Sequence, residues 1–346
     1  MAPPLPKDDL EPILENTRDL WESMRNQRIF ITGGTGFFGC WLVESFAHIN
    51  RALLLNAQAT ILTRNPAGFA AKCPHLAADP AVTLLAGDVR DFPFPVGEFR
   101  YVIHAATETT ARHASEAPAD QFSSILAGTE RVLEFAASHG TSRFLLTSSG
   151  AIYGKQPNSI THLPETYTGA LDPLLADSVY AEGKRAAELL CAVYQQTSGI
   201  ECAIARCWAF CGPHLPLDSH FAIGNFIGAA LSGRAIQITG DGTPRRSYLY
   251  ATDLAIWLWT MLFQAPSMVP INVGSDDDFS ILELAQTVAA ILNPATEIHI
   301  AKQLSPCTAP SRYVPSVDRA KQLLGLQQTI DTQESIRRTA AWLRSR

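Results

Sequence analysis

Short apolar runs alternate with longer segments of helical periodicity between Gln27 and Arg206. The predicted strands are residues 28–32, 59–62, 82–85, 101–104, 143–147 and 201–206, and the predicted helices are 41–49, 122–138 and 180–197. The strands are apolar throughout, which is typical of strands buried on both faces. Continuous apolar strands separated by helices indicate a parallel sheet with helices on each side. The pattern therefore predicts an α/β fold built on a doubly wound (Rossmann) parallel sheet.

This strict alternation stops after Arg206. Turns rich in proline and glycine are followed by helical patterns at 221–231 and 281–292 and an apolar run at 235–238. We interpret these segments as a smaller C-terminal α/β lobe that closes over the strand ends, where ligands bind in such folds. The expected domains are a dinucleotide-binding Rossmann domain (26–206 and 248–273) and a substrate-binding lobe (207–247 and 274–346).

Residues 1–25 precede this pattern and predict a helical extension. Asp8 and Asp9 could cap the start of this helix. Its apolar positions approximate one helical face: Leu10, Ile13, Leu14, Leu20, Trp21 and Met24. We expect the helix to lie on the outside of the main domain, with a partner-binding helix as the alternative.

The composition is that of an ordinary globular protein, with 47% apolar and 17% charged residues. A net charge of -6 gives no electrostatic basis for a nucleic-acid or polybasic membrane partner. No stretch reaches the ~20 apolar residues of a membrane span, and the acidic, polar start is unlike a signal peptide. We therefore expect a cytoplasmic protein.

The seven cysteines are scattered and include no CxxC pair. Cys207 and Cys211 are closest in sequence, but no further ligands follow them at zinc spacing. We expect a reducing compartment, no disulfide framework and no metal site.

A glycine-rich turn follows the first predicted strand and opens a helix. Gly33 permits the tight turn, Gly36 lets the backbone approach a pyrophosphate, and Gly39 allows close packing of helix on strand. The helix N-terminus, at Phe37 and Phe38, then presents free N–H groups to the phosphates. Glycines also make purely structural turns, but this strand and helix context favours dinucleotide binding.

The second predicted strand bears on which dinucleotide binds. It ends in Thr63-Arg64-Asn65 without the carboxylate that would bind the adenosine ribose hydroxyls of NAD. Arg64 could accommodate a 2′-phosphate, so NADP is slightly favoured over NAD. The alternatives for Arg64 are a solvated surface charge or a residue stacked on adenine.

Tyr180 and Lys184 are four residues apart and would share one helical face. An ammonium near a phenol favours the phenolate and should lower the tyrosine pKa toward the working range. The phenolate could then remove a hydroxyl proton during hydride transfer. Thr147-Ser148-Ser149 ends the fifth strand and can bring the Ser149 hydroxyl beside the tyrosine.

These features lie within a larger set of motifs: ITGGTGFFG (31–39), GDVRD (87–91), HAAT (104–107), LLTSSGAIYG (145–154), YAEGK (180–184), NFI (225–227) and GDGTPRRSYLYATDL (240–254). From about Gln27 onward the chain resembles an extended short-chain dehydrogenase/reductase of the NAD(P)-dependent nucleotide-sugar epimerase/dehydratase family.

The resemblance implies a role for several residues. Ser149 would contact the substrate hydroxyl, Tyr180 would act as the base, and Lys184 would hold the nicotinamide ribose. Asp88 and Val89 would lie at the adenine, and Ala105, Ala106 and Thr107 along the middle of the cofactor. Asn225, Arg246 and Arg312 would hold the diphosphate of a nucleotide sugar, for which arginine is well suited. The helices at 122–138 and 180–197 would form a homodimer contact.

The departures from the family pattern concern the reaction. Dehydratases of this family carry an Asp-Glu pair, and decarboxylases usually a nearby Glu, where this chain has Gly150-Ala151. Ala209 and Ile125 stand where many relatives have asparagine. These differences favour chemistry that needs only Ser149, Tyr180, Lys184 and the cofactor.

We therefore expect an enzyme that transfers hydride at C4 of a nucleotide-diphosphate sugar. Epimerisation through a 4-keto intermediate is slightly favoured. An NADPH-dependent 4-keto-sugar reductase, a 4,6-dehydratase and a decarboxylase remain open, and a non-catalytic dinucleotide-sensing regulator is the remote alternative.

Overall fold

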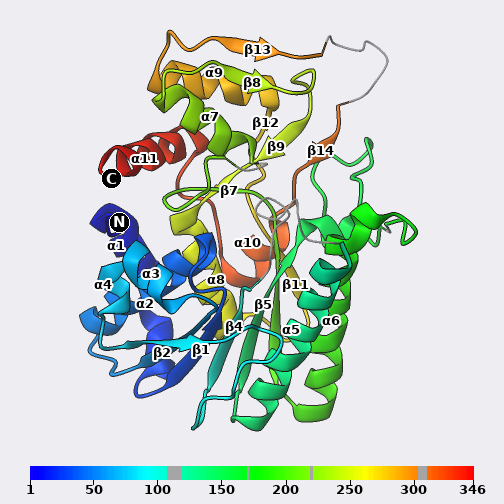
Figure 1. The fold of residues 1–346 in the computed structure, drawn as a ribbon. Helices are drawn as coiled ribbons and strands as arrows, with labels where there is room; N and C mark the ends of the chain where they lie inside the picture. The colour runs from blue at the N-terminus through cyan, green and yellow to red at the C-terminus, as the bar shows by residue number, and fades with distance from the viewer. Residues whose placement is uncertain (107–117, 170, 219–220, 303–309) are drawn as a thin grey trace.

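A seven-stranded, all-parallel sheet forms the centre of the molecule (Figure 1). The computed structural model describes residues 1–106, 118–169, 171–218, 221–302 and 310–346. The strand order is β11-β6-β5-β4-β1-β2-β3. The strands are β1 (Arg28–Thr32), β2 (Gln58–Thr63), β3 (Val82–Ala86), β4 (Tyr101–His104), β5 (Arg143–Ser149), β6 (Glu201–Cys207) and β11 (Pro270–Val273). The predicted doubly wound α/β fold is confirmed.

Helices cover both faces of this sheet. One face packs against α5 (Pro118–Ser138) and α6 (Val179–Ser198), and the other against α2 (Phe37–Ala52) and α8 (Ala251–Gln264). Two short helices, α3 (Pro66–Lys72) and α4 (Pro74–Ala77), follow β2. None of the helices in the described parts of the chain is long and apolar enough to cross a membrane.

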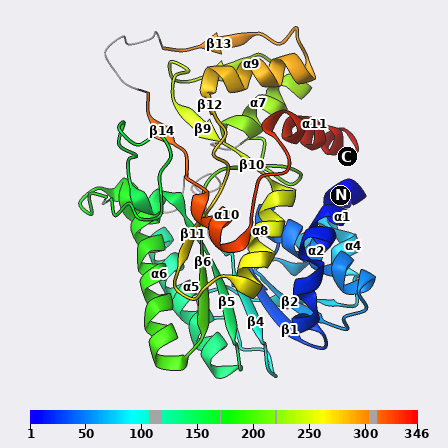
Figure 2. The same ribbon diagram turned by 180° about the vertical axis from the view of Figure 1, so that it is seen from behind.

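The remaining elements form a layer above the carboxyl ends of the strands (Figures 1 and 2). A separate apolar cluster joins α7 (Ala222–Leu231), α9 (Ile281–Leu292) and α11 (Thr332–Arg344). Two small sheets accompany them, β13 (Ile298–Ile300) with β8 (Ile236–Ile238), and β12 (Asp278–Ser280) with β9 (Arg245–Ser247) and β14 (Arg312–Tyr313). Short strands β7 (Phe210–Cys211) and β10 (Leu249–Tyr250) pair with each other, and α10 (Asp318–Leu324) packs against β11 and α8.

The N-terminal extension is part of the core. Helix α1 (Lys7–Thr17) packs against α8 and α2 and continues into a 3₁₀ helix (Arg18–Met24). Trp21 is fully buried, with its ring 4.7 Å from that of Trp259. The expected cap by Asp8 and Asp9 is wrong, because no side chain caps α1. Asp9 is instead buried and accepts hydrogen bonds from Tyr250 and Arg338.

Candidate functional site

The glycine turn between β1 and α2 has the shape that a bound pyrophosphate requires. Gly33 has a φ of 72°, and a Cβ there would lie 2.4 Å from the Ala105 carbonyl carbon. A Cβ on Gly39 would lie 2.2 Å from the Gly33 oxygen. A Cβ on Gly36 would meet only that oxygen, at 3.4 Å, so one side of the turn is open to a ligand. Because α2 begins at Phe37, its free N–H groups lie at this open side. The residues present therefore fit a dinucleotide.

The other predicted cofactor residues follow the strands next to this turn. Arg64 is exposed after β2 and lies close enough to Asp88 to lower the pKa of that carboxyl, although the hydrogen bonds from Arg90 are the main cause. Val89 packs into the space left by the absent side chain of Gly128 on α5.

The segment after β4 and the start of α2 complete this set. Ala105 follows β4 beside Gly33, and the Ala106 N–H donates to Thr32 Oγ1 at 3.2 Å. The Phe37 and Phe38 rings, in the first turn of α2, lie 5.7 Å apart. Thr107 lies outside the described residues.

The three predicted catalytic residues come from β5 and α6. Ser149 is the last residue of β5, and its hydroxyl lies close enough to the phenol of Tyr180, near the start of α6, to affect the pKa of that phenol. Lys184 lies one helical turn further along, buried, with its ammonium donating to the Thr147 carbonyl at 2.7 Å. The structure thus brings all three together at the carboxyl end of the sheet.

The electrostatics of this group differ from the expectation. Burial raises the pKa of Tyr180, and the hydrogen bond with Ser149 partly offsets this. Burial also lowers the pKa of Lys184 to about 8. The expected lowering of the tyrosine pKa by Lys184 is therefore not seen in this structure, in which Lys184 donates to a backbone carbonyl.

Tyr313, on β14, is a site residue that the sequence reasoning missed. Burial raises the pKa of its phenol, and the nearby Ser149 hydroxyl partly offsets this rise. Its ring centroid lies 4.4 Å from that of Trp208. A Cβ on Gly150 would lie 2.6 Å from the Trp208 ring and 2.9 Å from the Tyr313 oxygen. These two rings therefore occupy the space into which a dehydratase carboxylate at this position would extend.

A hydrogen-bonded network behind Ser149 holds Trp208 in place. Ser148 donates to Glu188, which forms a two-point ion pair with Arg206. Arg206 also donates to the phenol oxygen of Tyr153 at 2.9 Å. The amide oxygen of the buried Asn272 accepts from Tyr153 and from the Trp208 indole.

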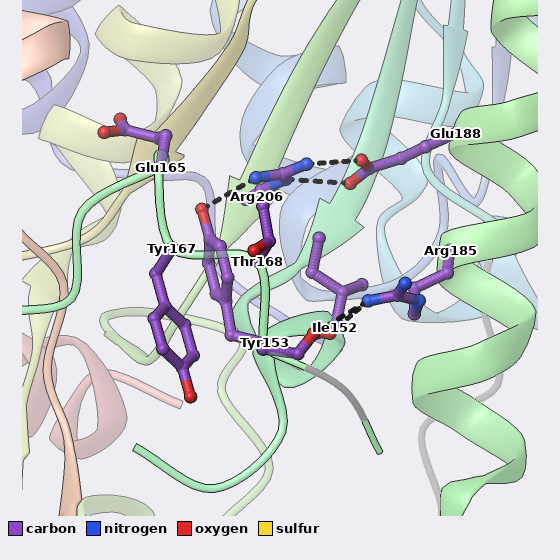
Figure 3. Close-up of a pocket in the computed structure, with 9 residues that line it drawn as sticks. Ile152, Tyr153, Glu165, Tyr167, Thr168, Arg185, Glu188 and Arg206 are labelled. Carbon is purple, nitrogen blue, oxygen red and sulfur yellow. Dashed lines mark hydrogen bonds and ion pairs between the residues drawn. The ribbon is translucent and has the colours of Figure 1, made fainter. Parts of the chain in front are cut away.

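Part of this network lines a cavity of about 240 Å³ beside α6 (Figure 3). Figure 3 shows Arg206 between the carboxylate of Glu188 and the phenol of Tyr153. Burial raises the pKa of Tyr153 to about 12, so this phenol stays protonated and can donate to Asn272. The charges of Arg206 and Glu188 neutralise each other. The network as a whole fixes the orientation of Trp208 in the wall of the site.

The predicted substrate residues lie in the upper layer. Arg246, on β9, is partly buried 5.9 Å from the Tyr313 ring, and its guanidinium donates to the Arg245 carbonyl. Arg312, on β14, is bound by the carboxylate of Asp278, which also holds Arg245. Asn225 is partly buried on α7. Of the two predicted arginines, Arg246 is therefore the one whose guanidinium lies over the ring of Tyr313, beside the catalytic residues.

The sheet, the glycine turn and the Ser149, Tyr180 and Lys184 group define a dinucleotide-binding α/β protein equipped for hydride transfer. The sequence model of the NAD-dependent epimerase/dehydratase family matches residues 29–274. The chain belongs to this family of NAD-dependent enzymes, and the predicted family and enzyme class are confirmed.

Individual relatives agree with this assignment. The chain is 30% identical to UDP-glucuronic acid decarboxylase 5 of Arabidopsis thaliana over 90% of its own length and 87% of the relative's. It resembles the UDP-glucose 4-epimerase of Thermus thermophilus in complex with NAD, with a TM-score of 0.74, 25% identity and coverage of 92% and 99%. The UDP-N-acetylglucosamine 4-epimerase of Methanobrevibacter ruminantium has the same fold, with a TM-score of 0.77, 21% identity and coverage of 93% and 99%.

Proposed function

We propose that the protein oxidises C4 of a nucleotide-diphosphate sugar and reduces it again, with epimerisation as the net reaction. The observation that carries this proposal is the pair of rings over Gly150. Trp208 and Tyr313 fill the space where an eliminating carboxylate would lie, while Ser149, Tyr180 and Lys184 are all in place. Oxidation and reduction at one carbon need no other acid or base.

Each residue has a defined part in this reaction. Tyr180 removes the proton of the C4 hydroxyl as the carbonyl forms, and later returns it. Ser149 orients the C4 oxygen and, through its hydrogen bond, stabilises the ionised tyrosine. NAD, held at its pyrophosphate by the turn of Gly33, Gly36 and Gly39, would supply the hydride acceptor for C4 and the hydride donor for the return step. Lys184 would hold the nicotinamide ribose, with an ammonium that is protonated at pH values below about 8.

Decarboxylation is the second candidate, and the similarity to UDP-glucuronic acid decarboxylases favours it. A ketone at C4 lies β to a carboxylate on C5, so the carbon–carbon bond can break with loss of carbon dioxide. The resulting enolate must then gain a proton at C5 before C4 is reduced. Ala151 offers no acid for that step, which is why we place epimerisation first.

We propose NAD as the cofactor, although Arg64 alone leans toward NADP. Three arguments support NAD. The matched family is NAD dependent, and an epimerase must begin each cycle with an oxidised cofactor. Asp88 also lies near Arg64 and partly neutralises the charge that a 2′-phosphate would need.

We also propose that α5 and α6 form the contact of a homodimer. Leu189 and Val193 lie one turn apart on α6 and are 66% and 45% exposed, which is unusual for large apolar side chains. Leu189→Glu should give a monomer by light scattering where the natural chain gives a dimer. A dimer that persists in this variant would contradict the contact.

Product mass tests the proposed reaction. The purified chain is first analysed for its copurifying dinucleotide and then incubated with UDP-, dTDP-, CDP- and GDP-sugars. A product of unchanged mass with inverted C4, seen by NMR, is the expected result. Loss of carbon dioxide would establish the decarboxylase instead. Loss of water or gain of two hydrogens would contradict both candidates.

A further inference from the structure

Three side chains that are far apart in the sequence meet in a buried cluster outside the catalytic group. Cys40 is in the first turns of α2, Cys73 follows α3, and His214 follows β7. One ligand atom of each lies within 4.8 Å of the others, and all three residues are buried. Among the described residues, these three side chains are the group of cysteine, histidine or carboxylate side chains whose ligand atoms lie close enough together to hold one metal ion.

His214 gives this cluster an unusual feature. The residue is only 7% exposed, yet neither ring nitrogen has a hydrogen-bond partner within the described part of the chain. Burying an imidazole without a partner is costly, and most buried polar groups in proteins are paired. Its backbone is also held at a φ of 70°, which is uncommon for a residue other than glycine. The fold therefore buries an imidazole without a hydrogen-bond partner beside two thiols, which lowers the stability of the folded state.

The surroundings suit a cation bound by thiolates. Lys72 Nζ lies 3.6 Å from Cys40 Sγ and donates to the Thr35 carbonyl at 3.2 Å. The imidazole of His214 is buried, and a neutral imidazole is the form that binds metals.

We propose that Cys40, Cys73 and His214 bind a thiophilic divalent cation of the Zn²⁺ type. Thiolate and imidazole are the preferred ligands of zinc, at about 2.3 Å and 2.0 Å. Tetrahedral geometry then requires the sulfur atoms to be roughly 3.8 Å apart. The cluster needs to contract by no more than about an ångström to reach this geometry, and a water can take the fourth position. On binding, each thiol releases one proton to solvent.

The position of the cluster indicates what the ion would do. The carbonyl bound by Lys72 belongs to Thr35, within the glycine turn. The N-terminal segment is attached next to the cluster, because the Ala2 N–H donates at 2.7 Å to the carbonyl of Lys72, the residue before Cys73. The Trp342 ring of α11 lies 4.7 Å from that of His214. A bound ion would thus join the dinucleotide turn to both ends of the chain, which lie close together in Figures 1 and 2.

Metal content of the purified full-length chain tests this proposal. The protein is loaded with ZnCl₂ and dialysed, and zinc is counted by mass spectrometry. We expect about one zinc per chain, and less than a tenth of that in Cys73→Ser and in His214→Asn. Asparagine is chosen because it tolerates the positive φ at this position. Loading with Co²⁺ should give a thiolate charge-transfer band that Cys73→Ser abolishes.

Cys191→Ser is the matched control, because Cys191 is another buried thiol beside a cysteine, Cys202, but belongs to no metal-like group among the described residues. It should retain the full zinc content. Circular dichroism establishes that each variant is folded. A natural chain that retains no zinc would overturn the proposal, as would equal zinc in Cys73→Ser and His214→Asn. A Cys40–Cys73 disulfide as the main form after anaerobic purification would also overturn it.

Discussion

At the scale of single residues, the hydroxyl of Ser149 lies beside two tyrosines. It partly offsets the rise that burial causes in the pKa of both Tyr180 and Tyr313, so Tyr313 is placed to orient the serine toward the substrate. Tyr313→Phe should lower kcat by about 2- to 12-fold, the equivalent of one neutral hydrogen bond of about 0.5–1.5 kcal/mol. Steady-state kinetics measures this, with Tyr194→Phe on the outer part of α6 as the control. An unchanged kcat would mean that Tyr313 does not position Ser149.

The two predicted diphosphate arginines should differ in importance. Arg246 is next to Tyr313, whereas Arg312 is already bound by Asp278. Arg246→Ala should raise KM for the nucleotide sugar by about 10- to 150-fold, because a charge-assisted hydrogen bond contributes about 1.5–3 kcal/mol. Arg312→Ala should have a much smaller effect. A larger rise in KM for Arg312→Ala would reverse this assignment.

Some of these residues could be predicted from local sequence motifs, whereas others come together only through tertiary packing. Ser149, Tyr180 and Lys184 are recognisable because each lies in a local motif tied to one strand end or one helical turn. Tyr313 reaches Ser149 only because β14 pairs with β9, and these strands are too short to leave a pattern. The cluster of Cys40, Cys73 and His214 likewise depends on tertiary packing that no spacing encodes.

At the scale of elements, the N-terminal helix is a structural component of the sheet's helical layer. Trp21 packs against Trp259 and Phe263 with full burial. Trp21→Ala should therefore lower the free energy of unfolding by about 3–5 kcal/mol, the usual cost of removing a large buried ring. Urea unfolding measures this, with the exposed Arg18→Ala as the control. A loss below about 1 kcal/mol would show that the extension is only loosely attached.

The central strands could be predicted because they are short apolar runs, typical of strands buried on both faces. Helix α8 could not be predicted from the sequence. Helix α8 is buried almost all round, so its residues carry no period of polar positions that distinguishes a helix. The opposite problem applies to β9 and β12, which have partly exposed, polar sequences of three residues each. Pairing with neighbouring strands, rather than local sequence, makes them strands.

At the scale of the whole molecule, buried neutral histidines make stability depend on pH. His104, which ends β4, is hydrogen-bonded to Thr32 and Thr129, and burial lowers its pKa to about 3. Between pH 6.5 and 3 the unfolded chain binds a proton that the folded chain does not. Stability is thus lost as pH falls through this range, by up to about 1.4 kcal/mol per pH unit for this group.

His104→Gln should therefore be less stable than the natural chain at pH 7 but lose stability less steeply toward pH 4.5. Urea unfolding at several pH values gives both slopes. The exposed His299→Gln should keep the natural slope. Equal slopes for His104→Gln and the natural chain would mean that His104 is not held neutral by the fold.

The central claim is that the assembled site transfers a proton through Tyr180 while NAD is bound by the rest of the domain. The direct test is the turnover of a nucleotide-sugar substrate by Tyr180→Phe, measured together with NAD affinity. We expect turnover to fall by about 10²- to 10⁴-fold, the usual contribution of a general acid–base group, with NAD affinity nearly unchanged. Turnover at the natural rate in this variant would contradict the account.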